Sequence, residues 1–289
     1  TGFFVAQQAG FYADVGLQVA LHSPYEDNYA RTPAKKLEQG DADLAIAPSE
    51  SVLSYRTKTQ PAQFVAIAAL LHADTSAIAT LADSSMQRPA DLDGKTYASY
   101  HARYEDAIVR QMIRNDGGAG ELTICYPEKL GIWDTLLTGD ADATWIFRAW
   151  EGIEAETQGV DLQVFRLENY GIPYGYSPLL LARERDLSER ADTLQAFLAA
   201  SEQGFRLAQH DPHRAVDYLR PFVPERDRER IDLLASQRYL NPLYTNADGA
   251  WGVMDINVWT RFLDWLYAQG LLSEPLTASE LFSNALYTH

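Results

Sequence analysis

Cysteine is nearly absent from this sequence, since Cys125 is the single one among 289 residues. One cysteine cannot form an intramolecular disulfide framework or a cysteine-based zinc site. Cys125 follows the apolar Ile124 and has no nearby base or cation in the sequence that would favour a reactive thiolate. We therefore interpret it as a small buried side chain.

Basic residues are also scarce. The chain has 24 Lys plus Arg against 40 Asp plus Glu, which gives a net charge of -16. Binding of nucleic-acid phosphates needs clustered Lys and Arg, so this composition argues against a nucleic-acid partner and equally against an anionic membrane surface. No apolar run approaches the ~20 residues of a transmembrane helix. The chain begins Thr1-Gly2-Phe3, without Met or a secretory signal, and we interpret it as having lost its natural start.

The common catalytic motifs are missing as well. The sequence contains no G-x-S-x-G elbow, no P-loop and no G-x-G-x-x-G fingerprint. His210 and His213 flank an Asp-Pro pair at the expected start of a helix, which is more typical of a solvated cap than of a metal pair. We predict no catalytic residue, no metal and no cofactor.

An internal repeat is the first feature that is present. Residues 37–43 and 136–142 both follow the pattern L-x-x-G-D-A-D, and an apolar run comes after each. This pattern predicts a helix that ends at a glycine, an acidic turn and a short buried strand. Coincidence in a chain rich in Ala and Asp is one interpretation, and two similar α/β lobes are the other.

The middle of the chain supports two lobes. A strand expected at 96–99 is followed by a loop and by a helix expected at 104–114, and ligands bind at such strand exits in open α/β sheets. The apolar segments 64–71 and 178–182 flank this region and could form the crossing strands of a hinge. From about residue 188 onward the apolar spacing predicts helices, so the fold class is α/β with a helix-rich C-terminal part.

Three groups of loop residues are candidates for a ligand-binding cleft. Ser49 and Ser51 follow the first repeat copy, where free backbone N–H groups can bind polar ligand atoms or the serines can simply cap a helix. Ser99, His101 and Arg103 form the loop before the expected helix, and the alternative for this loop is plain solvent exposure.

The third group follows the second repeat copy. Trp150 can face a cleft, and Arg148 lies beside it. In the segment 168–178, Glu168 can accept hydrogen bonds from an amino-heterocycle, while Tyr174 and Tyr176 can stack on a flat ring. A hinge crossing with packed tyrosines is the alternative for this segment.

Several of these motifs together resemble one family, the solute-binding proteins of ABC importers for thiamine-pyrimidine precursors, which also includes the fungal hydroxymethylpyrimidine synthases. The similarity runs through nearly the whole chain, in segments GFFVAQQAGFYADVGL at 2–17, GDADL at 40–44, GDADA at 139–143, YGIP at 170–173 and LFSN at 281–284. Relatives of this family also bind riboflavin, alkanesulfonates and nitrate, so the resemblance is more specific for the fold than for the ligand.

The resemblance implies a two-lobed type II periplasmic-binding-protein fold that closes on its ligand about two hinge-crossing strands. Lobe one would comprise 1–72 plus 182–289 and lobe two 73–181. The family's first strand would precede Thr1, which would leave lobe one with an open edge and part of the site missing.

The family's synthase branch needs a Lys and a His in the loop after the first acidic turn, and a cysteine-rich run before the second crossing strand. This chain has APSES at 47–51 and YGIPYGY at 170–176 in those places. The resemblance therefore implies a non-enzymatic carrier.

We expect this carrier to bind a small flat heterocycle, most specifically a hydroxymethyl or formylaminomethyl pyrimidine, and to deliver it to an ABC permease in the membrane. An alkanesulfonate, nitrate or riboflavin-like ligand stays an alternative, and an oxyanion gains support if Arg103 and Arg148 both face the cleft. We expect a monomer in the periplasm, or anchored to the outer face of a membrane. A synthase-like enzyme and a ligand sensor are the alternative functions.

Overall fold

Two β-sheets form the centre of the molecule. The computed structural model describes residues 1–127, 132–274 and 276–287. Within these ranges, no helix has the length and apolar composition needed to cross a bilayer. The smaller sheet has the strand order β1-β8-β2 and the larger one β5-β4-β6-β3-β7. The strands are β1 (Ala45–Ala47), β2 (Phe64–Ala69), β3 (Ser76–Leu81), β4 (Lys95–Ala98), β5 (Leu122–Cys125), β6 (Ala143–Phe147), β7 (Leu162–Phe165) and β8 (Leu179–Arg183).

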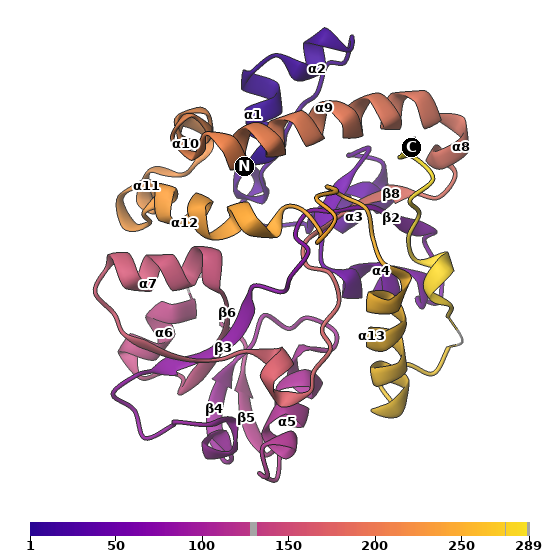
Figure 1. Ribbon diagram of the computed structural model, residues 1–289. Helices are drawn as coiled ribbons and strands as arrows, with labels where there is room; N and C mark the ends of the chain where they lie inside the picture. Colours follow the sequence, from indigo (N-terminus) through magenta and orange to yellow (C-terminus); the bar gives the residue numbers. More distant parts are fainter. Residues whose placement is uncertain (128–131, 275, 288–289) are drawn as a thin grey trace.

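The chain passes between the two sheets twice. It leaves the smaller sheet after β2 and returns to it before β8, so all strands between residues 76 and 165 belong to the larger sheet. The strands β2 and β8 lie side by side and antiparallel, with Val65 opposite Ala182 and Ala69 opposite Leu179. Figure 1 shows both passages near the middle of the molecule, between the half that contains β3, β4, β5 and β6 and the remainder. This arrangement is the two-part α/β architecture expected from the sequence.

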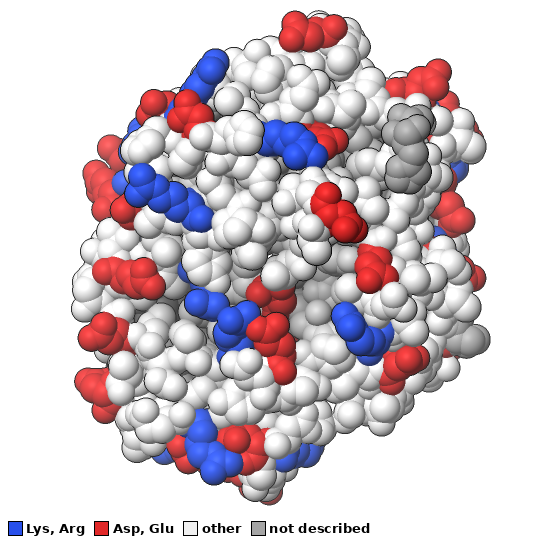
Figure 2. Space-filling model, in the orientation of Figure 1, with Lys and Arg blue, Asp and Glu red and all other residues white. Residues whose placement is uncertain are grey.

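The surface of the molecule is hollowed where these passages run. Figure 2, in the orientation of Figure 1, shows a depression near the centre of this face. Acidic and basic side chains lie together on one side of the depression, and a further basic side chain lies on the other. Acidic and basic side chains are otherwise scattered over this face, so the net charge of -16 forms no single patch in this view.

Strand β2 is buried along its whole length, which is what its continuous apolar sequence FVAIAA predicts. Its side chains divide between two hydrophobic clusters. Phe64 and Ala66 contribute to a core that extends into the larger sheet, whereas Val65 and Ile67 pack under the N-terminal and C-terminal helices. The smaller sheet therefore lies between two apolar cores and is held firmly in place.

The two repeat copies have the predicted local structure. Helix α3 (Pro33–Gln39) ends at Gly40 and helix α6 (Ile132–Thr138) ends at Gly139. These glycines have φ angles of +82° and +77°, a backbone conformation in which a side chain would be strained. Strand β1 follows the first copy and β6 follows the second.

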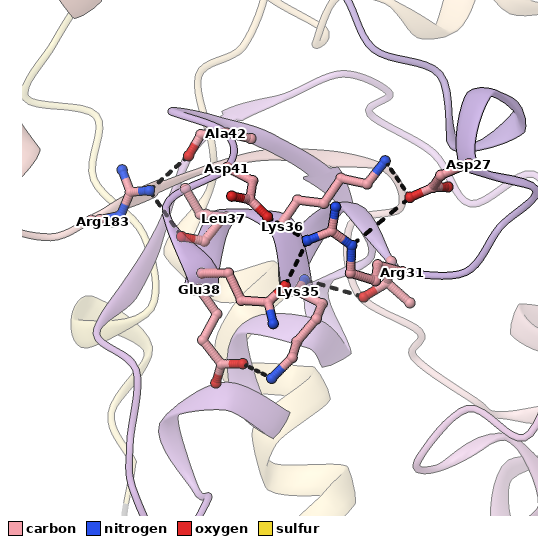
Figure 3. A network of polar contacts seen from close by, with 11 residues as sticks. Asp27, Arg31, Lys35, Lys36, Leu37, Glu38, Asp41, Ala42 and Arg183 are labelled. Carbon is pink, nitrogen blue, oxygen red and sulfur yellow. Dashed lines mark hydrogen bonds and ion pairs between the residues drawn. The ribbon is translucent and has the colours of Figure 1, made fainter.

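The turn between α3 and β1 is fixed by Arg183 of strand β8 (Figure 3). Its Nη2 donates to the carbonyl oxygens of Leu37, at 2.9 Å, and of Ala42, at 2.7 Å. The Leu37 carbonyl lies in the last turn of α3 and the Ala42 carbonyl lies in the turn that follows, so Arg183 bridges the two. The same figure shows Lys36 of α3 paired with Asp27 at 2.8 Å. Contacts from β8 and from Asp27 therefore fix α3 and the turn that leads into β1.

The strand–loop–helix unit of the middle segment is also present. Strand β4 precedes helix α5 (Glu105–Asn115), close to the expected ranges of 96–99 and 104–114. The buried face of α5 carries Ile108, Val109, Met112 and Ile113, which follow the helical spacing. Helix α4 (Ser49–Arg56) similarly follows β1, and α7 (Ile153–Thr157) follows β6 after a π-helical turn at Arg148–Gly152.

The C-terminal part is helical, as predicted. Its helices are α8 (Asp186–Glu189), α9 (Ala191–His210), α10 (Pro212–Leu219), α11 (Glu225–Arg230), α12 (Leu233–Leu240) and α13 (Ile256–Ala268). The N-terminal helices α1 (Gly2–Gln8) and α2 (Phe11–Asp14) pack against α9 (Figure 1). The predicted missing strand would lie before Thr1 and stays a prediction, as do the lobe boundaries at 72/73 and 181/182. Strand β8 crosses the second of these boundaries and belongs entirely to the smaller sheet.

Candidate functional site

The candidate site lies where the N-terminus of α4 meets the second passage between the sheets. The backbone N–H of Ser49 donates to the carbonyl oxygen of Tyr176 at 3.0 Å. The hydroxyl of Tyr174 donates to Oε1 of Glu50 at 3.2 Å. Gly175 allows this close approach, because a Cβ atom there would lie 2.6 Å from the Ser49 hydroxyl. The passage and the helix therefore bring serine, glutamate and tyrosine side chains together.

Three buried polar atoms at this place have no hydrogen-bond partner among the residues that the structure describes. They are Oγ of Ser49, Oε2 of Glu50 and the hydroxyl of Tyr104. The three side chains belong to residues that are 0%, 7% and 2% exposed. Leaving a buried polar group unpaired costs about 1–3 kcal/mol, and more for a charged group. Such a cluster is typical of a site whose partner is supplied by a ligand.

Burial raises the pKa of Glu50 from 4.5 to about 7. The nearby carboxyl group of Glu105 contributes to this rise, while hydrogen bonds from the Tyr174 hydroxyl and the Tyr104 backbone N–H oppose it by stabilising the carboxylate. Glu50 consequently changes charge near neutral pH. It can accept hydrogen bonds as a carboxylate or donate one as a neutral acid.

Glu105 holds the loop that faces Glu50. Its carboxyl group accepts hydrogen bonds from the hydroxyl of Tyr97 at 2.8 Å and from the backbone N–H groups of Tyr100, at 3.1 Å, and Ala102, at 3.3 Å. Burial raises the pKa of Glu105 as well. A glutamate in the first turn of a helix is a common cap, and this sequence signal could have found Glu105, which was not among the predicted residues.

Aromatic rings surround the glutamates. The ring of Tyr174 makes edge-to-face contacts with Trp145 of β6 and with Phe262 of α13, each at a centroid distance of 5.4 Å. The ring of Tyr176 lies 6.2 Å from that of His72, and its hydroxyl accepts from the backbone N–H of Asp255 at 2.9 Å. Tyr174 thus connects the two halves of the molecule next to the unpaired polar atoms.

The structure brings some of the predicted site residues to this place. Ser49 and Tyr174 contribute directly, and Tyr176 holds Ser49 through its backbone. Ser51 is half-buried in the first turn of α4. Glu50 and Tyr104 were not among the predicted residues.

The loop after β4 is braced mainly by its own residues. Ser99 donates to Asp106 at 2.7 Å and accepts from the backbone N–H of His101 at 3.0 Å. The exposed His101 ring packs against Tyr126 at 4.4 Å. Arg103 is exposed and donates to the hydroxyl of Thr57 at the end of α4. Arg103 therefore joins the loop to the other half of the molecule at its surface.

The remaining predicted residues lie apart from this cluster. The guanidinium of Arg148 lies over the ring of Tyr239, 5.2 Å from its centroid. Trp150 packs beside an apolar cluster that includes Ile153 and residues of the C-terminal helices. Glu168 is exposed and forms an ion pair with Arg166. The structure does not bring these three residues together with Ser49 and Tyr174.

The segment around Trp150 forms a second contact between the halves. The hydroxyl of Ser236 on α12 donates to the carbonyl oxygen of Ala149 at 2.6 Å. The backbone N–H of Asp232 donates to the hydroxyl of Thr157 at 3.1 Å. Two features of the larger sheet, the exit of β6 and the loop after β4, thus touch the other half on either side of the Glu50 cluster.

Two surface hollows lie away from the cluster. One, of about 500 Å³, is lined by charged residues such as Glu38 and Arg183, and the other, of about 230 Å³, includes Arg148 and Tyr239. Neither contains a buried polar atom without a partner among the described residues. The unpaired atoms at Ser49, Glu50 and Tyr104 therefore mark the better candidate.

Two other acids are half-buried and have raised pKa values. Burial raises the pKa of Asp74 to about 6 and that of Glu151 to about 7. Among the described residues, no three His, Cys, Asp or Glu side chains are placed to hold a metal ion. Cys125 is half-buried, and burial raises the pKa of its thiol, which reduces its thiolate fraction.

Comparison with known proteins agrees with this architecture. A family model described as NMT1/THI5 like matches residues 1–215. The formylaminopyrimidine-binding protein of Halalkalibacterium halodurans is 25% identical over 295 residues, which cover 98% of this chain and 86% of that protein. The riboflavin-binding protein RibY of Chloroflexus aurantiacus is 25% identical over 298 residues, with 98% and 80% covered.

Solved structures share the fold at lower identity. The alkanesulfonate-binding protein SsuA from Xanthomonas axonopodis pv. citri, bound to MOPS, has a TM-score of 0.71 and 15% identity, with 98% of this chain and 94% of that chain covered. The desulfurization enzyme DszB has a TM-score of 0.65 and 12% identity, with 99% and 94% covered.

The fold is thus the type II periplasmic-binding-protein fold, as expected from the sequence. The chain belongs to the NMT1/THI5-like family, which confirms the resemblance found in its motifs.

Proposed function

We propose that this chain is the solute-binding protein of an ABC importer and that it carries a small flat heterocycle. The leading ligand is a pyrimidine precursor of thiamine with a hydroxymethyl or formylaminomethyl group. The observation that carries this proposal is the buried cluster of unpaired polar atoms at Ser49, Glu50 and Tyr104 beside the ring of Tyr174. The name of the formylaminopyrimidine-binding relative supports the ligand class.

The charge of the site favours a heterocycle over an oxyanion. Glu50 and Glu105 are the buried charged groups of the cluster, and both are acids. Arg148 lies over Tyr239, away from the unpaired atoms, and Arg103, which lies over the ring of Tyr104, donates to Thr57 at the surface. An alkanesulfonate or nitrate would meet negative charge there. A riboflavin-like ligand stays the alternative, supported by the riboflavin-binding relative.

We propose a binding role without catalysis. The Lys, His and cysteine-rich run of the synthase branch are missing from the corresponding segments of this sequence. DszB shows that the same fold can also serve an enzyme, so this part of the proposal depends on the site residues and not on the fold.

The proposed mechanism is closure of the two halves on the ligand. Tyr174 and Trp145 would wall the ring, and Ser49 and Glu50 would bind its polar edge. Ser51, Ser99, His101 and Arg103 would complete the site from the two neighbouring loops. Ligand that contacts both halves shifts the population toward the closed form. A membrane permease would then recognise that form, with the carrier acting as a monomer outside the cytoplasm.

A fluorescence titration tests this proposal, because Trp145 lies beside the site. Hydroxymethylpyrimidine, riboflavin and an alkanesulfonate are added separately to the whole protein. We expect quenching by the pyrimidine at micromolar concentrations or below. Quenching by the alkanesulfonate alone would overturn the ligand assignment, and quenching by riboflavin alone would favour the alternative.

A further inference from the structure

The two carboxyl oxygens of Glu50 have different surroundings. Oε1 accepts the hydrogen bond from Tyr174, whereas Oε2 is buried and has no partner among the described residues. The backbone N–H of Tyr104 also stabilises the carboxylate, but each carboxylate oxygen has two lone pairs, so acceptor capacity remains on the carboxyl group. Glu50 therefore offers a complete carboxyl edge to a ligand that presents two polar atoms side by side.

We propose that Glu50 binds the amidine edge of a planar base, with one proton shared between its carboxyl group and the ring nitrogen. An amidine edge is an exocyclic amino group next to a ring nitrogen, as in a 4-aminopyrimidine. The amino group donates to one carboxyl oxygen, and the shared proton joins the other oxygen to the ring nitrogen. This inference rests on the proposed function and defines the class of ligand more narrowly.

The groups around Glu50 support this assignment. Glu105 on α5 is a second buried acid, and the hydroxyls of Tyr174 and Tyr104 come from the passage and from the loop before α5. The Arg103 guanidinium lies 5.1 Å from the centroid of the Tyr104 ring and donates to Thr57 instead of to Glu50. This excess of acid favours a donor or a cation at Oε2 and disfavours an anion.

The two remaining unpaired atoms fit the rest of such a ligand. Ser49 Oγ and the Tyr104 hydroxyl can each donate and accept. They can bind a hydroxymethyl or formylaminomethyl substituent on the ring. Glu50 pairs with the amidine edge and would leave the polar atoms of that substituent without partners.

In the complex, the carboxyl group of Glu50 and the ring nitrogen of the ligand hold one proton between them. An ionised Glu50 with a protonated base and a neutral Glu50 with a neutral base give the same paired state. For a base whose pKa lies below that of Glu50, which is about 7, both partners are deprotonated above pH 8, and binding there takes up one proton. When both partners are protonated at low pH, binding releases one proton. Affinity is therefore greatest at a pH between the pKa of the base and the pKa of Glu50.

Calorimetry measures this proton directly. The whole protein is titrated with 4-amino-5-hydroxymethyl-2-methylpyrimidine at pH 6 to 9, in two buffers that differ in ionisation enthalpy. We expect uptake to approach one proton per ligand above pH 8, and affinity to fall about tenfold per pH unit there. Binding without proton uptake at pH 8.5 would overturn the shared proton.

Two comparisons separate recognition of the amidine edge from a general attraction between the acidic site and a basic ligand. A matched pyrimidine with an imide edge, in which N–H lies between two carbonyls, should bind at least tenfold more weakly. Glu50→Leu should lower affinity for the aminopyrimidine at least tenfold, whereas Glu50→Gln, whose amide offers one donor and one acceptor to the same edge, should still bind it but without proton uptake or pH dependence. Glu189→Gln, an exposed change at the end of α8, should leave affinity within twofold.

The outcomes distinguish this inference from the function it rests on. If the aminopyrimidine binds wild type and Glu50→Leu equally, or if wild type binds the imide equally well, the inference is wrong and the carrier function stands. If wild type binds an alkanesulfonate and no pyrimidine, both are wrong. Circular dichroism checks that both Glu50 variants are folded.

Discussion

At the scale of single residues, Glu50 lowers the stability of the ligand-free protein near neutral pH, while the proposed site uses it to bind the ligand. It is buried beside another acid, and its Oε2 has no partner in the described part of the chain. Burial favours the neutral form, so ionised Glu50 destabilises the folded state near neutral pH. Residues with this kind of cost are common at functional sites, where the ligand removes it.

Glu50→Gln should therefore increase the stability of the ligand-free protein at alkaline pH. The folded-state pKa of Glu50 is raised from 4.5 to about 7, so its favourable contribution is complete below pH 4.5 and is lost as pH rises through 7. A shift of this size corresponds to about 3 kcal/mol. The stability difference between the variant and wild type should grow by about that amount from pH 4.5 to 8.5, as measured by urea unfolding.

The control for this experiment is Glu189→Gln, an exposed change whose effect should stay within about 0.5 kcal/mol at every pH. The acids Asp74 and Glu151 are present in all three proteins, so their titration cancels in the differences. Glu105 is coupled to Glu50, so the difference reports the two carboxyl groups as a pair. A constant difference between Glu50→Gln and wild type across this range would contradict the assigned pKa.

Tyr174→Phe should raise the pKa of Glu50 above about 7. The Tyr174 hydroxyl donates to Glu50 at 3.2 Å and stabilises the carboxylate, so its removal favours the neutral acid. The carboxyl carbon signal of Glu50, followed by NMR as a function of pH, measures this directly. Tyr25→Phe, at an exposed tyrosine, should leave the signal unchanged. A pKa that falls in Tyr174→Phe would show that the hydrogen bond is absent.

At the scale of helices and strands, the sequence predicted the features that depend on neighbouring residues, such as helix ends and the buried face of a helix. Gly40 and Gly139 end their helices because the backbone there has a positive φ, and the apolar spacing of α5 predicted its buried face. The contacts of Trp150 depend instead on where α10 to α12 pack, which the local sequence does not specify. Glu50 is one of 40 acidic residues, and only the tertiary structure shows that Tyr174 and Tyr104 enclose it.

Gly204→Ala should destabilise the packing of α1 on α9. A Cβ atom at Gly204 would lie 2.7 Å from the backbone nitrogen of Ala6, and the helix backbones would have to separate. Overpacking of this kind costs about 1–3 kcal/mol, although Gly to Ala in an open helix position is stabilising. Urea unfolding measures the change. Gln203→Ala, exposed on the same helix, should change stability by less than about 0.5 kcal/mol, and equal effects would refute the close packing.

At the scale of the whole molecule, the described residues of the two halves meet at the passages and at lateral contacts on either flank. One lateral contact joins Arg103 to Thr57 and another joins α12 to the segment after β6. The repeat predicted the two-part architecture correctly. It did not predict the lateral contact through Ser236, because that contact joins residues 87 positions apart.

Ser236→Ala should weaken the lateral contact. The buried hydroxyl donates to Ala149 at 2.6 Å, and its loss leaves a carbonyl unpaired, at a cost of about 1–3 kcal/mol. Ser188→Ala removes an exposed hydroxyl bonded to Arg185 and should cost less than about 0.5 kcal/mol. Thermal unfolding compares the two variants, and equal melting temperatures would show that the contact contributes nothing.

The most direct test of the proposed carrier is a crystal structure of the protein with 4-amino-5-hydroxymethyl-2-methylpyrimidine. We predict that the ring lies beside Tyr174 and Trp145, with its amino group and ring nitrogen about 3 Å from the two oxygens of Glu50. A ring bound elsewhere, or bound with Glu50 turned away from it, would contradict the site and the function built on it.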